Sequence, residues 1–119
     1  MAEAIARHEA SDIIIPSSAG LVPLGYIAGP TSRTLLGNGF QVDDLFSKPV
    51  TRDLWNDAEI VINMSGRRAP AAFPDFRDLG KVENWLVQDP YGADTAVYQR
   101  IFEDIRQRIQ ELADRLRAI

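Results

Sequence analysis

Apolar residues near the C-terminus recur at steps of mostly three and four, which is the spacing of one face of an α-helix. This face is formed by Tyr98, Ile101, Phe102, Ile105, Ile109, Leu112, Ala113 and Leu116. The opposite face carries two acid–base pairs four residues apart, in the order that stabilises a helix: Asp104 with Arg108 and Glu111 with Arg115. The pattern predicts a long amphipathic helix at the end of the chain.

Three shorter apolar runs predict strands. Residues 59–64, EIVINM, are apolar after the first position apart from Asn63, as in a strand that is covered on both faces. Asp12 to Pro16, DIIIP, is a brief β-branched run that is typical of a buried strand. Residues 83–88, which contain the apolar trio WLV, predict a third strand.

Turn and capping signals predict three further helices. Residues 2–10 are rich in alanine and predict a short helix. Pro30 suits the first turn of a helix that ends near Leu36, because Gly37-Asn38-Gly39 is a strong C-terminal signal. Thr51 is the expected N-cap of another short helix.

Helices that alternate with buried strands predict an α/β fold with three layers, a parallel sheet with helices on both faces. At 119 residues the chain makes one domain. Ligands bind such sheets beyond the carboxyl ends of the strands. Three segments are expected there, and together they form the candidate site: residues 17–20, 65–68 and 89–92.

Asp89 and the pair Arg67 and Arg68 are the candidates for chemistry at this place. Asp89 follows an apolar run and precedes Pro90, so it is either a general acid or the start of an Asp-Pro turn, and its spacing alone favours the turn. The two arginines could bind an anion, but adjacent arginines are more often solvated. The residues alone leave both questions open.

Other reaction classes find no support in the sequence. Ser17 and Ser18 have no visible base, and the single histidine, His8, stands near the end of the first helix, so a Ser-His-Asp triad is not expected. The chain has no cysteine, hence no disulfide and no thiolate metal site. No phosphate-cradling glycine motif and no metal-ligand spacing is found, and we expect no cofactor.

The composition limits the kinds of binding partner and the cellular compartment that we expect for this protein. Hydrophobic residues make up 45% of the chain and charged residues 25%, values that are ordinary for a soluble globular protein. No apolar run approaches the ~20 residues that cross a bilayer, and no secretory signal is visible. A net charge of −4 makes nucleic acid an unsuitable partner. We expect a cytoplasmic protein that does not bind membranes.

Several segments, taken in order, resemble one family over essentially the whole chain. They are MAEAIARH at the start, SSAG, GYIAGP, LLGNGF, NDAEIVINM, and WLVQDPYGADTAVYQRIFEDI before the C-terminal end. Together they resemble the low-molecular-weight protein tyrosine phosphatases and the related arsenate reductases. DPYG, followed by a spaced tyrosine and a helix, is the most specific part and favours the phosphatases.

The resemblance implies roles for four residues. Asp89 would be the general acid of a phosphatase and Tyr91 the aromatic wall beside it. Ser18 resembles the residue that braces the phosphate loop through hydrogen bonds, and Tyr26 lies in the loop that shapes substrate access. The implied ligands are phosphorylated proteins or small phosphoesters.

The resemblance also identifies what this sequence lacks. The family nucleophile is a cysteine in a Cys-x5-Arg loop between the first strand and the first helix, and this sequence begins at that helix. Without the thiolate and the groups that hold the phosphoryl oxygens, we expect no activity by the family route. The missing strand is internal to the family sheet, between the strands expected at Asp12 to Pro16 and at residues 59–64, and its absence would leave open strand edges. Either the strand at Asp12 to Pro16 shifts to pair with residues 59–64, or a second copy fills the gap, and we expect a homodimer. The alternative is a non-catalytic dimeric interaction protein or a phospholigand-binding relative.

Overall fold

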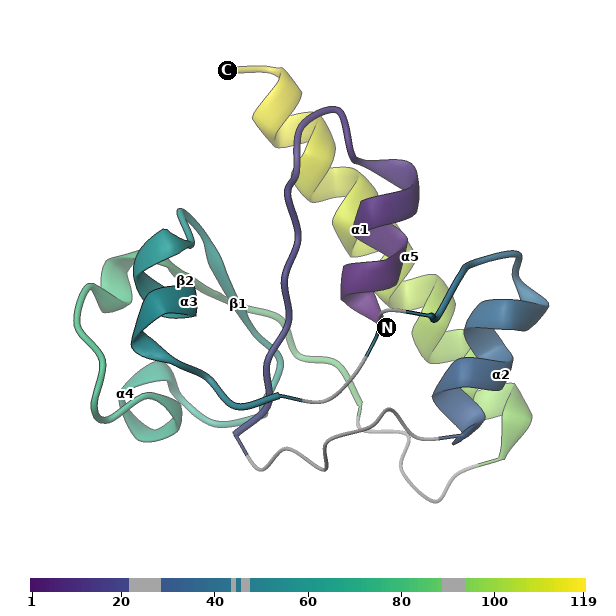
Figure 1. Ribbon diagram of the computed structural model, residues 1–119, viewed down its shortest axis with the longest axis horizontal. Coiled ribbons are helices and arrows are strands. Elements are labelled where there is room, and N and C mark those ends of the chain that lie inside the picture. The colour runs from purple at the N-terminus through teal and green to yellow at the C-terminus, as the bar shows by residue number, and fades with distance from the viewer. Residues whose placement is uncertain (22–28, 44, 46–47, 89–93) are drawn as a thin grey trace.

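The structure, a computed structural model, describes residues 1–21, 29–43, 45, 48–88 and 94–119 (Figure 1). In this part the helices are α1 (Ala2–Glu9), α2 (Gly29–Gly37), α3 (Arg52–Asp57), α4 (Ala69–Ala72) and α5 (Thr95–Arg117). The strands are β1 (Val61–Asn63) and β2 (Val82–Asn84), and a short 3-10 turn, Leu79–Lys81, leads into β2.

The two strands pair in parallel, with Val61 opposite Val82 and Asn63 opposite Asn84. A separate parallel bridge joins Gly20 to Pro49. The predicted α/β class with a parallel sheet is therefore confirmed, although the sheet formed by the described residues has two strands.

The larger hydrophobic core lies between α5, α1 and one face of the sheet. The predicted apolar face of α5 is buried along most of its length, and Phe102 is 1% exposed. Ile5 of α1 and Leu35 of α2 are fully buried against it, and Ile62 of β1 packs on the same cluster. In Figure 1, α1 and α2 both lie against α5, in agreement with the contacts between these helices.

A second core covers the other face of β1. Trp55 of α3 stacks on Phe76 with 4.8 Å between ring centroids and lies 4.9 Å from Phe73, and Val61 packs against this cluster. The side chains of Val61 and Ile62 therefore point to opposite faces of the sheet, as successive side chains of a β-strand do. Each of these faces is covered by helices. The predicted arrangement of helices on both faces is confirmed.

The helix ends follow the predicted signals. Thr51 caps α3 by accepting a hydrogen bond from the backbone N–H of Leu54 at 3.2 Å. The chain leaves α2 through Gly39, which has a positive φ of 85°, a conformation that glycine adopts without strain. None of the described helices is both long and apolar enough to cross a bilayer.

The predicted buried strand at Asp12 to Pro16 is wrong. Residues 11–13 form a turn, in which the backbone N–H groups of Ile13 and Ile14 donate to the carbonyl of Ala10 at 3.1 and 2.8 Å. The chain then continues without pairing, and Ile15 is fully exposed. A β-branched run forms a strand only beside another strand, and no described strand lies next to it.

Two finer predictions also need correction. The third strand is shorter than expected, because it ends at Asn84 and leaves Leu86 85% exposed. The expected pair of Glu111 with Arg115 does not form: Arg115 donates to both carboxylate oxygens of Glu83 at 2.7 and 2.9 Å. A bidentate contact across elements replaces a single contact along the helix.

Candidate functional site

A hollow of about 440 Å³ opens at the carboxyl end of β1. It lies where the ends of parallel strands predicted a site. Its walls come from the residues after both strands and from the beginnings of α1, α2 and α5. They are Met1, Thr31, Met64, Ser65, Gly66, Val87, Gln88, Ile101 and Ile105.

The described wall of this hollow combines apolar side chains with uncharged polar ones. Met64, Val87 and Ile105 belong to the apolar part, while Ser65 and Gln88 are polar. At the amino group of Met1, burial lowers the pKa, and the Glu3 carboxylate acts in the opposite direction. No arginine or lysine side chain is among the described residues that line the hollow.

Asn63, the last residue of β1, shapes the edge of the hollow. Its buried amide nitrogen donates to the carbonyl of Arg67 at 2.7 Å and to the Asn84 side chain at 2.9 Å. Its amide oxygen accepts from the backbone N–H and the hydroxyl of Ser65 at 3.1 and 2.7 Å. Gly66 then turns the chain with a φ of 78°. This role was not predicted, although Asn63 stood out as the polar residue in an apolar run.

Glu3 of α1 is a second residue that sequence reasoning missed. It is 8% exposed, and its carboxylate accepts hydrogen bonds from the Ser18 hydroxyl and the Arg7 guanidinium. The Lys48 ammonium lies 3.7 Å from the same carboxylate. Glu3 therefore fastens the two segments around Gly20 and Lys48 to α1. An acidic residue in an alanine-rich helix gave no signal of this.

Only part of the expected site is brought together by the described residues. Ser65 and Gly66 line the hollow, and so do Val87 and Gln88, which directly precede Asp89. Ser18 is placed by its bond to Glu3 and does not line the hollow. Asp89, Tyr91 and Tyr26 lie outside the described residues, and their roles stay predictions.

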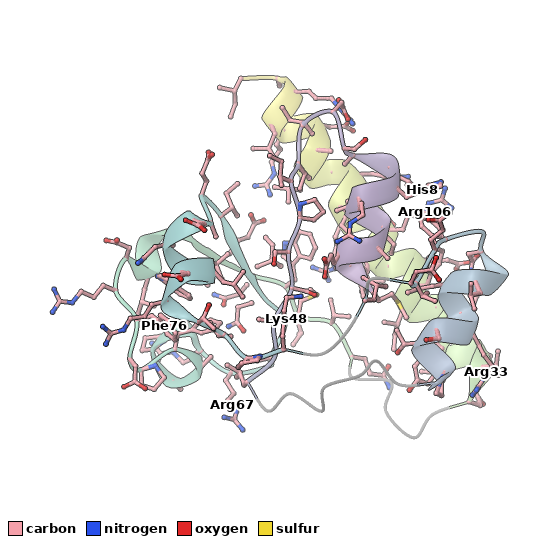
Figure 2. The ribbon with its side chains drawn as sticks, viewed as in Figure 1. His8, Arg33, Lys48, Arg67, Phe76 and Arg106 are labelled. Atoms are coloured by element: carbon pink, nitrogen blue, oxygen red, sulfur yellow. The ribbon has the colours of Figure 1, made fainter. Side chains whose placement is uncertain are left out.

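The remaining candidates lie away from the hollow. Arg67 and Arg68 are exposed and are not among its lining residues, and Figure 2 shows Arg67 projecting outward. His8 packs its ring against Phe40, with 4.7 Å between ring centroids. In the ranges that the structure describes, no three His, Asp or Glu side chains gather as metal ligands would.

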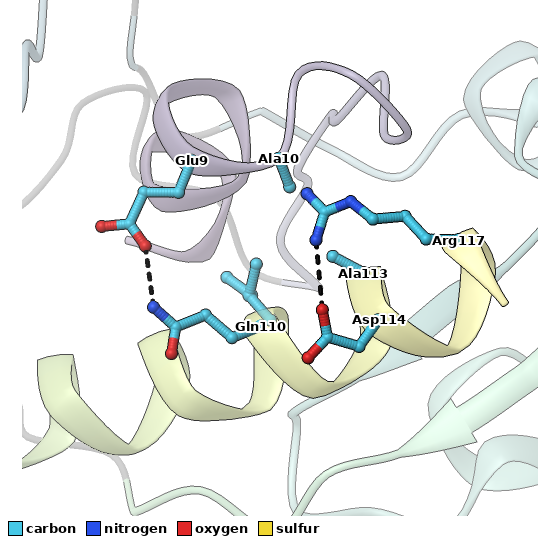
Figure 3. A pocket seen from close by; sticks show the side chains of 7 residues that line it. Glu9, Ala10, Gln110, Ala113, Asp114 and Arg117 are labelled. Atoms are coloured by element: carbon cyan, nitrogen blue, oxygen red, sulfur yellow. Dashed lines mark hydrogen bonds and ion pairs between the residues drawn. The ribbon is translucent and has the colours of Figure 1, made fainter.

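A smaller hollow of about 300 Å³ lies between the end of α1 and the last turns of α5 (Figure 3). Its polar side chains bond to one another: Gln110 donates to Glu9 at 3.2 Å, and Arg117 donates to Asp114 at 3.2 Å. Arg117 also donates twice to Asp12 at 2.8 Å. These mutual bonds fasten α1 to α5 and leave little bonding capacity for a ligand.

The contact between Asp12 and Arg117 shifts the pKa of both side chains. The hydrogen bonds from Arg117 lower the pKa of the Asp12 carboxyl, and those same bonds raise the pKa of Arg117. The pair therefore joins the turn after α1 to the end of α5 as long as Asp12 is ionised.

Known proteins resemble this chain over its full length. Residues 1–119 match the family described as low molecular weight phosphotyrosine protein phosphatase. A relative from Ralstonia nicotianae, described as the probable low molecular weight protein-tyrosine-phosphatase EpsP, is 25% identical over 128 residues, which cover 100% of this chain and 88% of the relative.

Solved structures share the fold. A YwlE mutant from Bacillus subtilis superposes with a TM-score of 0.84 at 22% identity, covering 98% of this chain and 88% of that one. The Erwinia amylovora tyrosine phosphatase amsI gives a TM-score of 0.79 at 19% identity, covering 97% and 82%. An arsenate reductase in the reduced state gives 0.76 at 19% identity, covering 97% and 86%.

These likenesses agree with the parallel pairing of β1 and β2 and with the helices on both faces of the sheet. Among the segments that resembled the phosphatases in the sequence, residues 1–8 contain most of α1, residues 35–40 the end of α2, and residues 56–64 the end of α3 and β1. The match of the family to every residue of the chain decides the assignment. The chain belongs to the low-molecular-weight phosphotyrosine protein phosphatase family.

Proposed function

We propose that the 119 residues, by themselves, form a phosphatase-family protein that does not hydrolyse phosphomonoesters. The observation that carries the proposal is the absence of cysteine from the sequence. The family reaction begins with the attack of a low-pKa thiolate on phosphorus. It also requires fixed donors that stabilise the charge on the phosphoryl oxygens.

The described surroundings of the hollow support this proposal. Ser65 and Thr31 bring the hydroxyl groups of the described wall, and the Ser65 hydroxyl donates its proton to Asn63, an amide that cannot act as a base. Asp89, as a general acid, would supply about 10²–10⁴-fold, and only to a bond that a nucleophile is already attacking. With Tyr91, Ser18 and Tyr26 it would form the remainder of a substrate site in a cytoplasmic protein whose ancestral ligands are phosphorylated proteins or small phosphoesters.

A hydrolysis assay tests the proposal. The purified chain and its Asp89→Asn variant are incubated with p-nitrophenyl phosphate, and the release of nitrophenolate is followed. We expect both proteins to match the rate in buffer. Turnover by the unsubstituted chain that is lost in Asp89→Asn would overturn the proposal. Equal turnover by both proteins would indicate a contaminating phosphatase, which further purification removes.

An alternative function is a non-catalytic interaction between two copies of the chain. The observation that favours it is β1, which pairs with β2 on one edge and has no described partner on the other. Exposed strand edges invite pairing with another chain. Binding of a phospholigand has less support, because Arg67 and Arg68 do not line the hollow. The mass in solution, measured by light scattering, separates a monomer from a homodimer.

A further inference from the structure

Arg67 and Arg68, which follow β1, form an exposed pair of cations. Neither guanidinium is hydrogen-bonded or ion-paired to another described residue. Most arginines of α1 and α5, by contrast, are held in ion pairs: Arg7, Arg106, Arg108, Arg115 and Arg117. The described part of the chain therefore leaves Arg67 and Arg68 available for contact with another molecule.

The backbone that carries this arginine pair is held in place by hydrogen bonds. The carbonyl of Arg67 accepts from the buried Asn63 side chain at 2.7 Å, and its N–H donates to the Ser65 hydroxyl at 3.2 Å. The carbonyl of Arg68 accepts from the N–H of Ala72 at 2.9 Å. Both side chains thus extend from a fixed backbone, which reduces the entropy that is lost when a ligand orders them.

No acidic residue lies near the arginine pair along the chain. Residues 60–74 contain Arg67 and Arg68 but no aspartate or glutamate, in a protein whose net charge is −4. The exposed neighbours Pro70, Ala71 and Pro74 are uncharged. This segment therefore presents positive charge on a chain that is negative overall.

The arginine pair lies beside the candidate hollow and on the opposite face of the sheet from Met1. Arg68 directly precedes α4, whose Ala72 belongs to the second core, whereas Met1 packs on the larger core around α5. Residues 65 and 66 line the hollow, and the next two residues are the arginines. Figure 2 shows the Arg67 side chain projecting outward. A ligand can therefore reach the pair without entering the hollow.

We propose that Arg67 and Arg68 bind an acidic, extended segment of another polypeptide. The backbone of Arg68 is extended, with φ −63° and ψ 147°, and successive side chains of an extended chain point apart. Two diverging guanidinium groups suit carboxylates on separate residues of a polypeptide better than one small anion. The net charge of −4 disfavours nucleic acid, whose phosphates are densely spaced. The contact requires neither hydrolysis nor the pairing of two copies.

The binding of an acidic peptide tests the proposal. The probe is a fluorescent peptide of alternating glutamate and glycine, and its anisotropy is followed as the complete chain is added. We expect the double substitution Arg67→Ala with Arg68→Ala to raise the Kd by about tenfold, because two charge-assisted contacts are lost. The matched control, Arg77→Ala with Arg100→Ala, removes the same charge from two exposed positions and should change the Kd by less than about twofold.

Each result decides for or against the surface formed by Arg67 and Arg68. Binding that the first double substitution weakens and the control does not weaken supports it. Equal weakening by both would show a response to net charge alone and would overturn the proposal. Failure of the unsubstituted chain to bind the peptide would overturn it as well. Equal thermal unfolding of the three proteins checks that the fold is intact.

Amide NMR signals locate the contact independently. When the peptide is added to the isotope-labelled chain, we expect the signals of residues 66–69 to shift, and shifts confined to α5 would contradict the proposal. Inorganic phosphate should displace the peptide no better than sodium chloride of equal ionic strength. Displacement well beyond that of the salt would indicate a site for small anions and would overturn the assignment of a polypeptide ligand.

Discussion

Two buried polar residues, Glu3 and Asn63, hold the segments around the candidate site. Each sits among hydrophobic neighbours and satisfies its polar atoms with several partners from other parts of the chain. A buried polar group stabilises a fold only while its partners remain. Their substitution is therefore a direct test of how the site is built.

Replacement of Glu3 by glutamine should lower the free energy of unfolding by about 1–3 kcal/mol, because Ser18, Arg7 and Lys48 lose a charged acceptor. Urea unfolding, followed by circular dichroism, measures the change. Glu59→Gln, at an exposed position, is the control and should stay within about 0.5 kcal/mol of the original chain. Equal effects of the two substitutions would contradict the role of Glu3.

Asn63→Ala should cost about 1–3 kcal/mol, because the carbonyl of Arg67, the Asn84 side chain and the groups of Ser65 lose their partner. It should also speed amide hydrogen exchange at residues 65–67, since Asn63 holds this loop. Asn56→Ala, on the exposed side of α3, is the matched control. Unchanged exchange in the loop would show that Asn63 does not organise it.

The proposed role of Asp89 as a general acid depends on a nucleophile that these 119 residues do not supply. If a strand and a Cys-x5-Arg loop, as in the resembling family, are added before Met1, the longer chain should hydrolyse p-nitrophenyl phosphate. Asp89→Asn should then lower kcat by about 10²–10⁴-fold, the usual contribution of a general acid. A folded, active extended chain that tolerates Asp89→Asn would show that Asp89 is the first residue of a turn and no more.

At the scale of elements, α5 connects the whole fold. Its apolar face forms the larger core, and its arginines reach across to other segments: Arg115 to Glu83, Arg108 to the carbonyl of Leu86, and Arg117 to Asp12. The second and third of these contacts attach irregular segments whose backbones have few bonds of their own. The long helix thus positions chain segments that do not fold as strands.

The Asp12–Arg117 contact should give stability a dependence on pH. Because the pKa of Asp12 is lowered from its ordinary value of 3.8, chiefly by the hydrogen bonds from Arg117, the stabilisation is present above pH 3.8 and is lost as the pH falls through the lower folded value. Asp12→Asn should therefore reduce stability at pH 7 and make less difference near pH 3. Urea unfolding at both pH values measures this.

A control for this pH dependence is Asp75→Asn, a substitution at an exposed carboxylate in the segment before β2. It should change stability little at either pH. If Asp12→Asn destabilised the chain equally at pH 7 and pH 3, the contact would owe its effect to shape and not to the charge of Asp12.

At the scale of the whole molecule, the described residues build the family fold around a small parallel sheet with a hydrophobic core on each face. The cores on both faces of β1 are well formed, and the structure superposes on solved members of the same fold. Among the described residues, β1 has a strand partner on one edge only, which is β2. The proposed lack of phosphatase activity would therefore reflect missing chemical groups and not a failure to fold.

The helices and the class of fold were predictable because their signals are local. The three- and four-residue spacing in α5, the cap at Thr51 and the turn at Gly39 act within a few residues, and all three appear as predicted. The sequence by itself also shows that these 119 residues contain no cysteine, which no fold of them can supply. A hollow lies beyond the end of β1, where the sequence predicted a site, and its function stays a prediction.

What only the tertiary structure decided depends on partners far away in the sequence. Whether Asp12 to Pro16 becomes a strand depends on a neighbouring strand, because a strand completes its hydrogen bonds outside itself. Arg115 prefers Glu83 to Glu111, and Glu3 and Asn63 acquire their roles only when distant segments surround them. Helical spacing can be recognised from residues three and four positions apart in the sequence. Strand pairing and buried polar contacts, in contrast, form only when distant segments come together in the folded chain.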